Sequence, residues 1–167
     1  EQKRIYKELK DYAMAELDGV ETVTTSTVIT QILRLQQVLC GFTRSDTGEI
    51  VPIPNNRVSE LMSILEETEG KCIIWANYQY DIRSLVSKIA EVHGNNSVAS
   101  YYGETPAEDR QGIVTRFQDP DSPLKFFVGQ PRTGGFGLTL TAASTVIYYS
   151  NSYDLEIRLQ SEDRAHR

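Results

Sequence analysis

Three polar side chains near the end of the chain could bind a phosphate group. Gln160, Arg164 and Arg167 follow one another at steps of four and three residues, which would place them on one face of a helix. Two guanidinium groups on one face repel each other unless an anion lies opposite, and their planar donors match phosphate oxygens. A positioned arginine can accelerate phosphoryl transfer by about 10³–10⁵. The alternative is a solvated helix face, with Glu162 and Asp163 as partners of the arginines.

A glycine-rich segment, residues 129–138, follows a predicted strand. It contains Gly134, Gly135 and Gly137, and glycines at this density let backbone N–H groups approach a phosphate or another backbone closely. The chain has no Gly-x-x-x-x-Gly-Lys-Ser/Thr loop, and Leu140 stands where a dinucleotide fingerprint would have its third glycine. The segment therefore indicates either a phosphate-contacting loop or a tight turn from strand to helix.

A third candidate lies where another predicted strand passes into a helix. Thr105, Pro106 and Glu108 fit a capping box with proline at the first helical position, so we expect a helix to begin here. Free N–H groups at a helix start can hold a backbone phosphate. Tyr101 and Tyr102 could stack on a base, although aromatic residues at a strand end more often pack in the core.

Apolar periodicity predicts the elements that must position these groups. Two helices are expected within residues 1–40, followed by a loop or linker that reaches residue 56. The predicted strands, separated by helices, are 72–76, 98–102, 125–128 and 145–149. This alternation is typical of an α/β fold, a parallel sheet with helices on both faces, in which ligands bind at the carboxyl ends of the strands. We therefore expect a helical extension and linker over 1–56 and an α/β domain over 57–167.

Length and composition exclude several classes of protein. The 167 residues are 40% hydrophobic and 24% charged, the balance of a globular protein. No apolar run approaches the roughly 20 residues of a membrane helix, so no membrane partner is expected. The net charge of −6 argues against binding nucleic acid by bulk positive charge, and any such contact must be local. Cys40 and Cys72 lack a CxxC or histidine partner in sequence, so neither a metal site nor a disulfide scaffold is expected.

Five segments, taken in order, resemble the second motor lobe of a Swi/Snf-type superfamily-two ATPase. They are residues 71–77, 101–111, 116–118, 133–143 and 160–167. The most specific pieces are Gly-Gly-Phe-Gly-Leu-Thr-Leu-Thr-Ala-Ala and, near the end, Gln-Ser-Glu-Asp-Arg-Ala-His-Arg. The resemblance implies a RecA-like fold, in a motor that binds ATP between two such lobes.

The resemblance also implies roles for individual residues. Arg164 and Arg167 would reach the triphosphate as arginine fingers, with Gln160 helping to orient the site. ATP and Mg²⁺ would be held mainly by a first RecA-like lobe of the same polypeptide, which is absent from this chain. Residues implied to couple the nucleotide to the DNA backbone are Gly134, Gly135, Gly137 and Thr139. Residues implied to hold one DNA strand by its phosphates are Asn77, Gly103 and Thr105.

We therefore expect this chain to be the second lobe of a DNA-dependent ATPase that acts on duplex DNA. The isolated chain is expected to be inactive. The chain lacks an initial Met and is expected to be part of a longer polypeptide. An intracellular location is expected: cytoplasm or nucleoid for a bacterial or phage source, nucleus for a eukaryote. The alternative is a non-catalytic RecA-like module that binds DNA or protein. A phosphate-binding Gly-Lys-Ser/Thr loop encoded upstream of residue 1 would favour the motor over this alternative.

Overall fold

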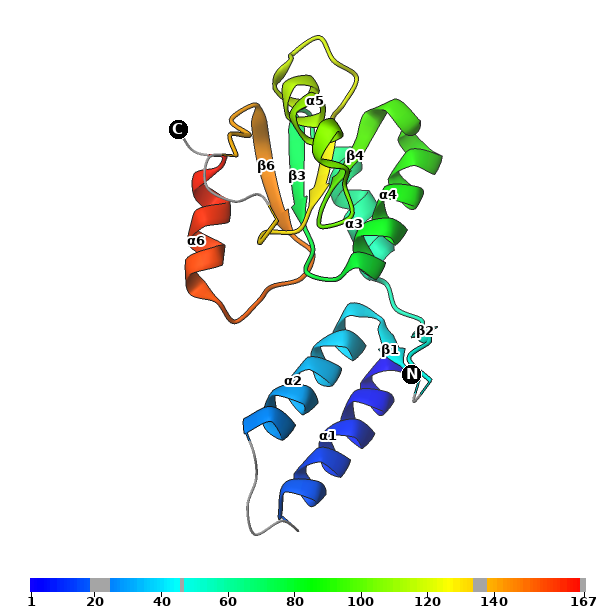
Figure 1. Ribbon diagram of the computed structural model, residues 1–167. Coiled ribbons are helices and arrows are strands. Elements are labelled where there is room, and N and C mark those ends of the chain that lie inside the picture. The colour runs from blue at the N-terminus through cyan, green and yellow to red at the C-terminus, as the bar shows by residue number, and fades with distance from the viewer. Residues whose placement is uncertain (19–24, 46, 134–137, 166–167) are drawn as a thin grey trace. The chain divides into compact units, whose positions relative to one another are not determined.

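A computed structural model describes residues 1–18, 25–45, 47–133 and 138–165 (Figure 1). The chain forms two compact units, Glu1–Ser59 and Glu60–Arg167. Each unit is described by itself. The predicted boundary after residue 56 lies close to this division.

The smaller unit is built on two helices, α1 (Gln2–Asp18) and α2 (Thr25–Cys40). The Gln2 side-chain amide donates to the carbonyl oxygen of Val38 at 2.8 Å and joins the start of α1 to the end of α2. Gly41 follows α2 with φ of +92°, a left-handed conformation that glycine adopts without strain. The prediction of two helices within residues 1–40 is confirmed.

A short hairpin occupies part of the segment predicted as a loop. β1 (Phe42–Arg44) pairs antiparallel with β2 (Ile50–Pro52). The turn is closed at Ser45, whose hydroxyl accepts from the backbone N–H of Glu49 at 3.1 Å. The loop prediction is wrong for these strands, because three residues are too few to show a periodic apolar pattern in the sequence.

The larger unit is built on a four-stranded parallel sheet. Its strands are β3 (Lys71–Trp75), β4 (Val98–Tyr101), β5 (Phe126–Gly129) and β6 (Ala143–Tyr148). Their spatial order is β4-β5-β3-β6, and every neighbouring pair is parallel. The predicted parallel sheet is confirmed, and its four carboxyl ends meet at one edge.

Helices cover both faces of this sheet (Figure 1). They are α3 (Arg57–Glu67), α4 (Gln79–His93), α5 (Ala107–Gln118) and α6 (Leu155–Asp163). Phe117 of α5 packs against Phe127 of β5, with ring centroids 5.4 Å apart. The adjacent Phe126 contacts His93 of α4 at 4.9 Å. Since successive strand residues point to opposite faces, α5 and α4 lie on opposite sides of the sheet.

The inner strand β3 is buried from Cys72 through Trp75, as its continuous apolar run predicts. Burial raises the pKa of the Cys72 thiol to about 12, so the thiol behaves as a small core side chain. Cys40, in the smaller unit, is also a buried thiol.

The start of α5 differs from the predicted capping box, which is wrong. Pro106 is the N-cap and α5 begins at Ala107, with no side-chain cap. The Thr105 hydroxyl instead accepts from the backbone N–H of Tyr102 at 3.0 Å and donates to the Ser100 carbonyl at 3.2 Å. The hydroxyl is used by the turn that leaves β4, so it does not cap the helix.

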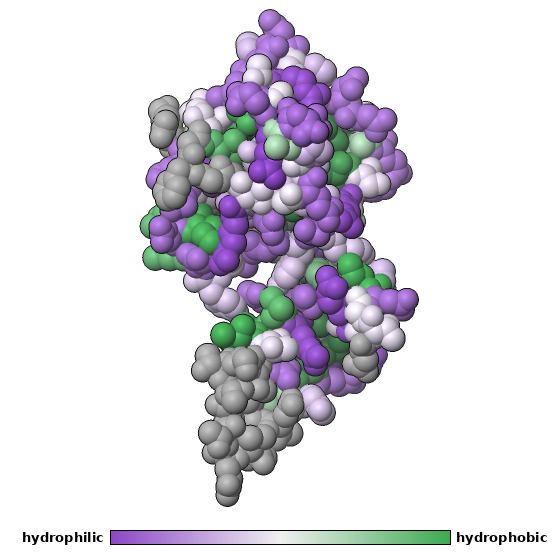
Figure 2. All heavy atoms as spheres, in the orientation of Figure 1, coloured by the Kyte–Doolittle hydropathy of each residue, from purple (hydrophilic) through white to green (hydrophobic). Residues whose placement is uncertain are grey.

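Apolar surface remains on α6, which lies beside β6 (Figures 1 and 2). Leu155 and Leu159 lie one helical turn apart and are 69% and 53% exposed. The N-terminus of α6 is capped by Asp154, whose carboxylate accepts from the Ile157 N–H at 3.3 Å. Among the helices of the described ranges, none combines the length and apolar character needed to cross a membrane.

Candidate functional site

Several candidate residues lie at the carboxyl edge of the parallel sheet. Asn77 follows β3, and its backbone N–H donates to the hydroxyl of Ser150, which follows β6, at 2.8 Å. Gln130 follows β5, and its side-chain amide donates to the Asn77 carbonyl at 2.9 Å. The Gln130 backbone N–H donates to the carbonyl of Tyr101, the last residue of β4, at 2.9 Å. Hydrogen bonds therefore link the ends of all four strands.

Hydrogen bonds to Gln130 also stabilise a turn at the start of the glycine-rich segment. The Thr133 hydroxyl donates to the Gln130 side-chain oxygen at 3.1 Å, and the Thr133 N–H to the Gln130 carbonyl at 3.0 Å. Thr139 is half-buried beyond this segment. The glycines predicted to contact phosphate lie outside the described residues: Gly134, Gly135 and Gly137. The coupling role of this segment stays a prediction.

The loop after β4 is held by Arg110 of α5, a residue to which the sequence assigned no role. Its Nε donates to the Thr105 carbonyl at 3.1 Å, and its Nη2 contacts the carbonyls of Tyr102 and Gly103 at 3.4 Å. Gly103 is exposed, and a Cβ built there would meet nothing within 4 Å. The fold therefore leaves room for a side chain at Gly103.

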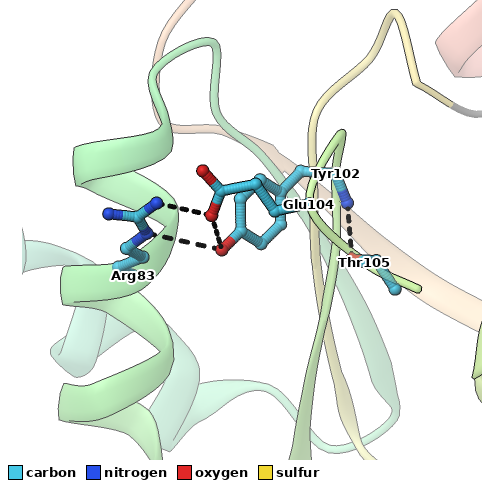
Figure 3. Close-up of polar contacts among 4 residues, drawn as sticks. All are labelled: Arg83, Tyr102, Glu104 and Thr105. Atoms are coloured by element: carbon cyan, nitrogen blue, oxygen red, sulfur yellow. Dashed lines mark hydrogen bonds and ion pairs between the residues drawn. The ribbon is translucent and has the colours of Figure 1, made fainter.

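Two side chains of this loop reach toward α4 (Figure 3). The Glu104 carboxylate pairs with Nη2 of Arg83 at 2.5 Å and accepts from the Tyr102 hydroxyl at 3.1 Å. Hydrogen bonds from Arg83 and then Tyr102 lower the pKa of Glu104. Arg83 and Tyr102 also line a groove of about 630 Å³ between α4 and β4.

The two tyrosines that could stack on a base lie in different environments. Tyr101 is 7% exposed and its ring stacks on Phe127 at 5.4 Å, so the core interpretation is confirmed for Tyr101. Tyr102 is half-buried and contacts Arg83 and Glu104.

Arg164 follows the last residue of α6 and lies against the aromatic core. It is 8% exposed, and its guanidinium carbon is 5.4 Å from the centroid of the Trp75 ring. Burial lowers the pKa of Arg164, and Tyr101 and Tyr148 oppose the shift. The solvated-face alternative is therefore wrong for Arg164.

The other candidates on α6 have local contacts. Gln160 donates to the Glu156 carboxylate at 3.0 Å, along the same helix. Glu162 pairs with Arg158 at 2.5 Å, and the Arg158 guanidinium lies 3.4 Å from the Tyr148 ring centroid. Arg167 lies outside the described residues. The grouping of Gln160, Arg164 and Arg167 around a nucleotide stays a prediction.

The polar groups described at this edge are guanidinium groups, backbone N–H groups and hydroxyls, donor types that also form hydrogen bonds to anions. Within the described ranges, no group of three or more His, Cys, Asp or Glu side chains could hold a metal ion.

Comparisons with known proteins give the same fold and relate the chain to ATP-dependent enzymes. Residues 55–167 match the family model described as the helicase conserved C-terminal domain. A probable ATP-dependent helicase of Plasmodium falciparum is 33% identical over 111 residues, which is 66% of this chain and 5% of that protein. The human SWI/SNF-related matrix-associated actin-dependent regulator of chromatin subfamily A member 1 is 29% identical over 109 residues, 65% of this chain and 9% of that protein.

A solved structure extends the match to most of the chain. The C-terminal domain of the Sulfolobus solfataricus SWI2/SNF2 ATPase has a TM-score of 0.70 at 24% identity, covering 89% of this chain and 66% of that one. This likeness supports the RecA-like fold. The chain spans only 5–9% of the length of the two curated relatives. By its sequence and its fold, the chain belongs to the helicase conserved C-terminal domain family and has a RecA-like fold.

Proposed function

We propose that this chain is the second motor lobe of a DNA-dependent ATPase of the Swi/Snf type. In this proposal Arg164 and Arg167 contact ATP that a first RecA-like lobe holds with Mg²⁺, and Gln160 helps to orient the site. The observation that carries the proposal is the place of Arg164, beside Trp75 at the carboxyl end of β3. Membership in a helicase family supports the use of ATP.

The residues present fit one side of a nucleotide site. The chain supplies arginine but no phosphate-binding lysine loop, so it is suited to complete a site that another lobe builds. Mg²⁺ would neutralise charge on the triphosphate. The arginine stabilises the charge that develops on the transferred phosphoryl group, and it does so only when the lobes close and exclude water.

Part of the DNA-tracking surface is proposed for the same edge of the sheet. Asn77, Gly103 and Thr105 would contact backbone phosphates of duplex DNA. The glycine-rich segment would couple these contacts to the nucleotide through Gly134, Gly135, Gly137 and Thr139. With a net charge of −6, the chain by itself should bind DNA weakly and release it at modest salt. In a eukaryotic source, the nucleus is the expected compartment.

The test is the substitution Arg164→Lys in a two-lobed protein that contains this chain. Lysine keeps the charge but loses the planar fork, so kcat should fall at least about 100-fold, within the range known for arginine fingers, while KM for ATP changes little. Arg116→Lys, at an exposed position at the end of α5, is the matched control and should retain the rate. A near-normal kcat in Arg164→Lys would contradict the arginine-finger role.

A second test uses the purified chain, which should hydrolyse no ATP with or without DNA. The physical reason is that a guanidinium can stabilise a transition state only where another lobe places the nucleotide. DNA-stimulated turnover by the chain alone would contradict the proposal.

The burial of Arg164 favours a second candidate, a non-catalytic RecA-like module that binds DNA or protein. A cation that is 8% exposed and packed on Trp75 could serve the stability of the lobe alone. The two-lobed protein would then hydrolyse no ATP, and Arg164→Lys would only lower its melting temperature. The comparison of rate with melting temperature separates the two candidates.

A further inference from the structure

The loop proposed to contact DNA carries a carboxylate between its two contact residues. Glu104 lies between Gly103 and Thr105, and its side chain is 50% exposed. A carboxylate at this position repels a phosphate that approaches the loop. The proposed surface therefore needs a cation close to Glu104.

Arg83 of α4 is that cation (Figure 3). Its Nη2 pairs with Glu104, and its Nε donates to the Tyr102 hydroxyl at 3.4 Å. The Arg83 side chain is 59% exposed. Among the described residues, neither of these contacts uses the Nη1 group, so an approaching phosphate can contact Nη1 before it displaces Glu104 from Nη2.

The other arginines near this edge are engaged differently. Arg110 donates to three carbonyl oxygens of the loop. Arg132 pairs with Asp154 at 3.5 Å. Arg164 is buried against Trp75. Arg83 combines exposure with direct contact to the loop.

We propose that Arg83 is a further DNA-contacting residue, whose guanidinium binds a backbone phosphate beside Gly103 and Thr105, and that Glu104 competes for it. The inference rests on the proposed DNA surface. Exposed ion pairs are weak, and a DNA phosphate gains from the release of its condensed counterions when a guanidinium replaces them. A phosphate can therefore take over contacts that Glu104 makes when DNA is absent.

The experiment measures binding of a fluorescein-labelled duplex to the full 167-residue chain by fluorescence anisotropy, over a series of NaCl concentrations starting at low salt. Arg83→Gln should weaken binding about three- to tenfold and reduce the slope of log K against log salt by about 0.9, the loss of one phosphate contact. Glu104→Gln should tighten binding about two- to fivefold, because repulsion and competition are both removed. An unchanged slope in Arg83→Gln would overturn the proposal.

The same helix offers a matched control. Lys88 and Glu91 form an exposed pair at 2.9 Å, with side chains 44% and 68% exposed. Lys88→Gln removes the same charge from α4 and should change affinity by less than about twofold. A loss equal to that of Arg83→Gln would show a general charge effect and would overturn the specific contact.

The double variant separates direct contact from neutralisation of Glu104. If Arg83 binds phosphate, Arg83→Gln should still lower the affinity and the salt slope in the Glu104→Gln background. If Arg83 only neutralises Glu104, the double variant should match Glu104→Gln, which would overturn the proposal.

A substitution at Gly103 tests separately whether DNA approaches the loop after β4. A side chain fits at Gly103, so Gly103→Glu should fold normally and weaken binding if DNA phosphates approach this loop. If Gly103→Glu weakens binding and Arg83→Gln does not, only the Arg83 inference fails. If wild type does not bind, or neither variant changes binding, the proposed DNA surface fails as well.

Discussion

At the carboxyl edge of the sheet, the arginine beside β3 and β6 and the arginine beside β4 differ in burial and in the contacts that they make. Beside β3 and β6, Arg164 is 8% exposed and lies on the Trp75 ring. Beside β4, the Arg83 side chain is 59% exposed and pairs with Glu104. Packing fixes the first cation, while the second depends on polar contacts that water and salt weaken. The buried arginine is thus held in one place by the fold, whereas the exposed one can exchange partners.

The largest effect is expected at the buried end. Trp75 is fully buried and packs edge-on against Phe127, with ring centroids 6.0 Å apart. Trp75→Ala should lower the free energy of unfolding by about 3–5 kcal/mol, measured by urea denaturation. Trp75→Phe, which keeps an aromatic ring under Arg164, should lose less.

The matching substitution at the exposed end is Tyr102→Ala. Tyr102 is half-buried, and its removal should lower the free energy of unfolding by about 1 kcal/mol. If Trp75→Ala and Tyr102→Ala lowered the free energy of unfolding equally, this would contradict the view that core packing holds Arg164 but not Arg83.

An intermediate effect is expected at Arg110, which holds the β4 loop through backbone carbonyls. Hydrogen bonds to a charged group are worth more than neutral ones, so Arg110→Gln should lower the free energy of unfolding by about 1–2 kcal/mol. Hydrogen exchange at the Thr105 amide, which donates to the Tyr102 carbonyl at 3.0 Å, should become faster.

The control for Arg110 is Arg116→Gln on the same helix, at an exposed position. It should change stability by no more than about 0.5 kcal/mol. If exchange at Thr105 were as fast in this variant as in Arg110→Gln, Arg110 would have no specific hold on the loop.

The strands and most helices of the larger unit could be predicted from sequence because each leaves a local pattern. β3 is a continuous apolar run. The Asp154 side chain caps α6 by accepting from the backbone N–H of Ile157, only three residues later. Gly94 ends α4 with φ of +91°. Such signals act within a few residues. The alternation of strands and helices then indicated the parallel sheet.

The rest depends on contacts between residues far apart in the chain. Arg164 was predicted on a common face with Gln160, but its stacking on Trp75 joins positions separated by most of the larger unit. Gln130 joins three strand ends through Tyr101 and Asn77, and no local pattern marks that role. Thr105 has the spacing of a helix cap, yet the turn after β4 uses its hydroxyl.

The smallest effect is expected at Glu104 in acid. Its pKa is lowered by hydrogen bonds from Arg83 and then Tyr102. A lowered folded-state pKa means that these contacts stabilise the chain above the usual glutamate pKa and are lost as pH falls through the lowered value. A carbon-13 NMR titration should therefore find a midpoint for Glu104 below that of the unfolded chain.

The same titration distinguishes a local ion pair from the field of the whole domain. Arg83→Gln should raise the Glu104 midpoint, whereas Lys88→Gln on the same helix should leave it in place. Added salt should also raise the midpoint, because Arg83 and Glu104 are both at least half exposed. If the Glu104 midpoint moved equally in Arg83→Gln and Lys88→Gln, Arg83 would affect Glu104 only through long-range electrostatics. Arg83 and Glu104 would then form no specific contact that a phosphate could replace.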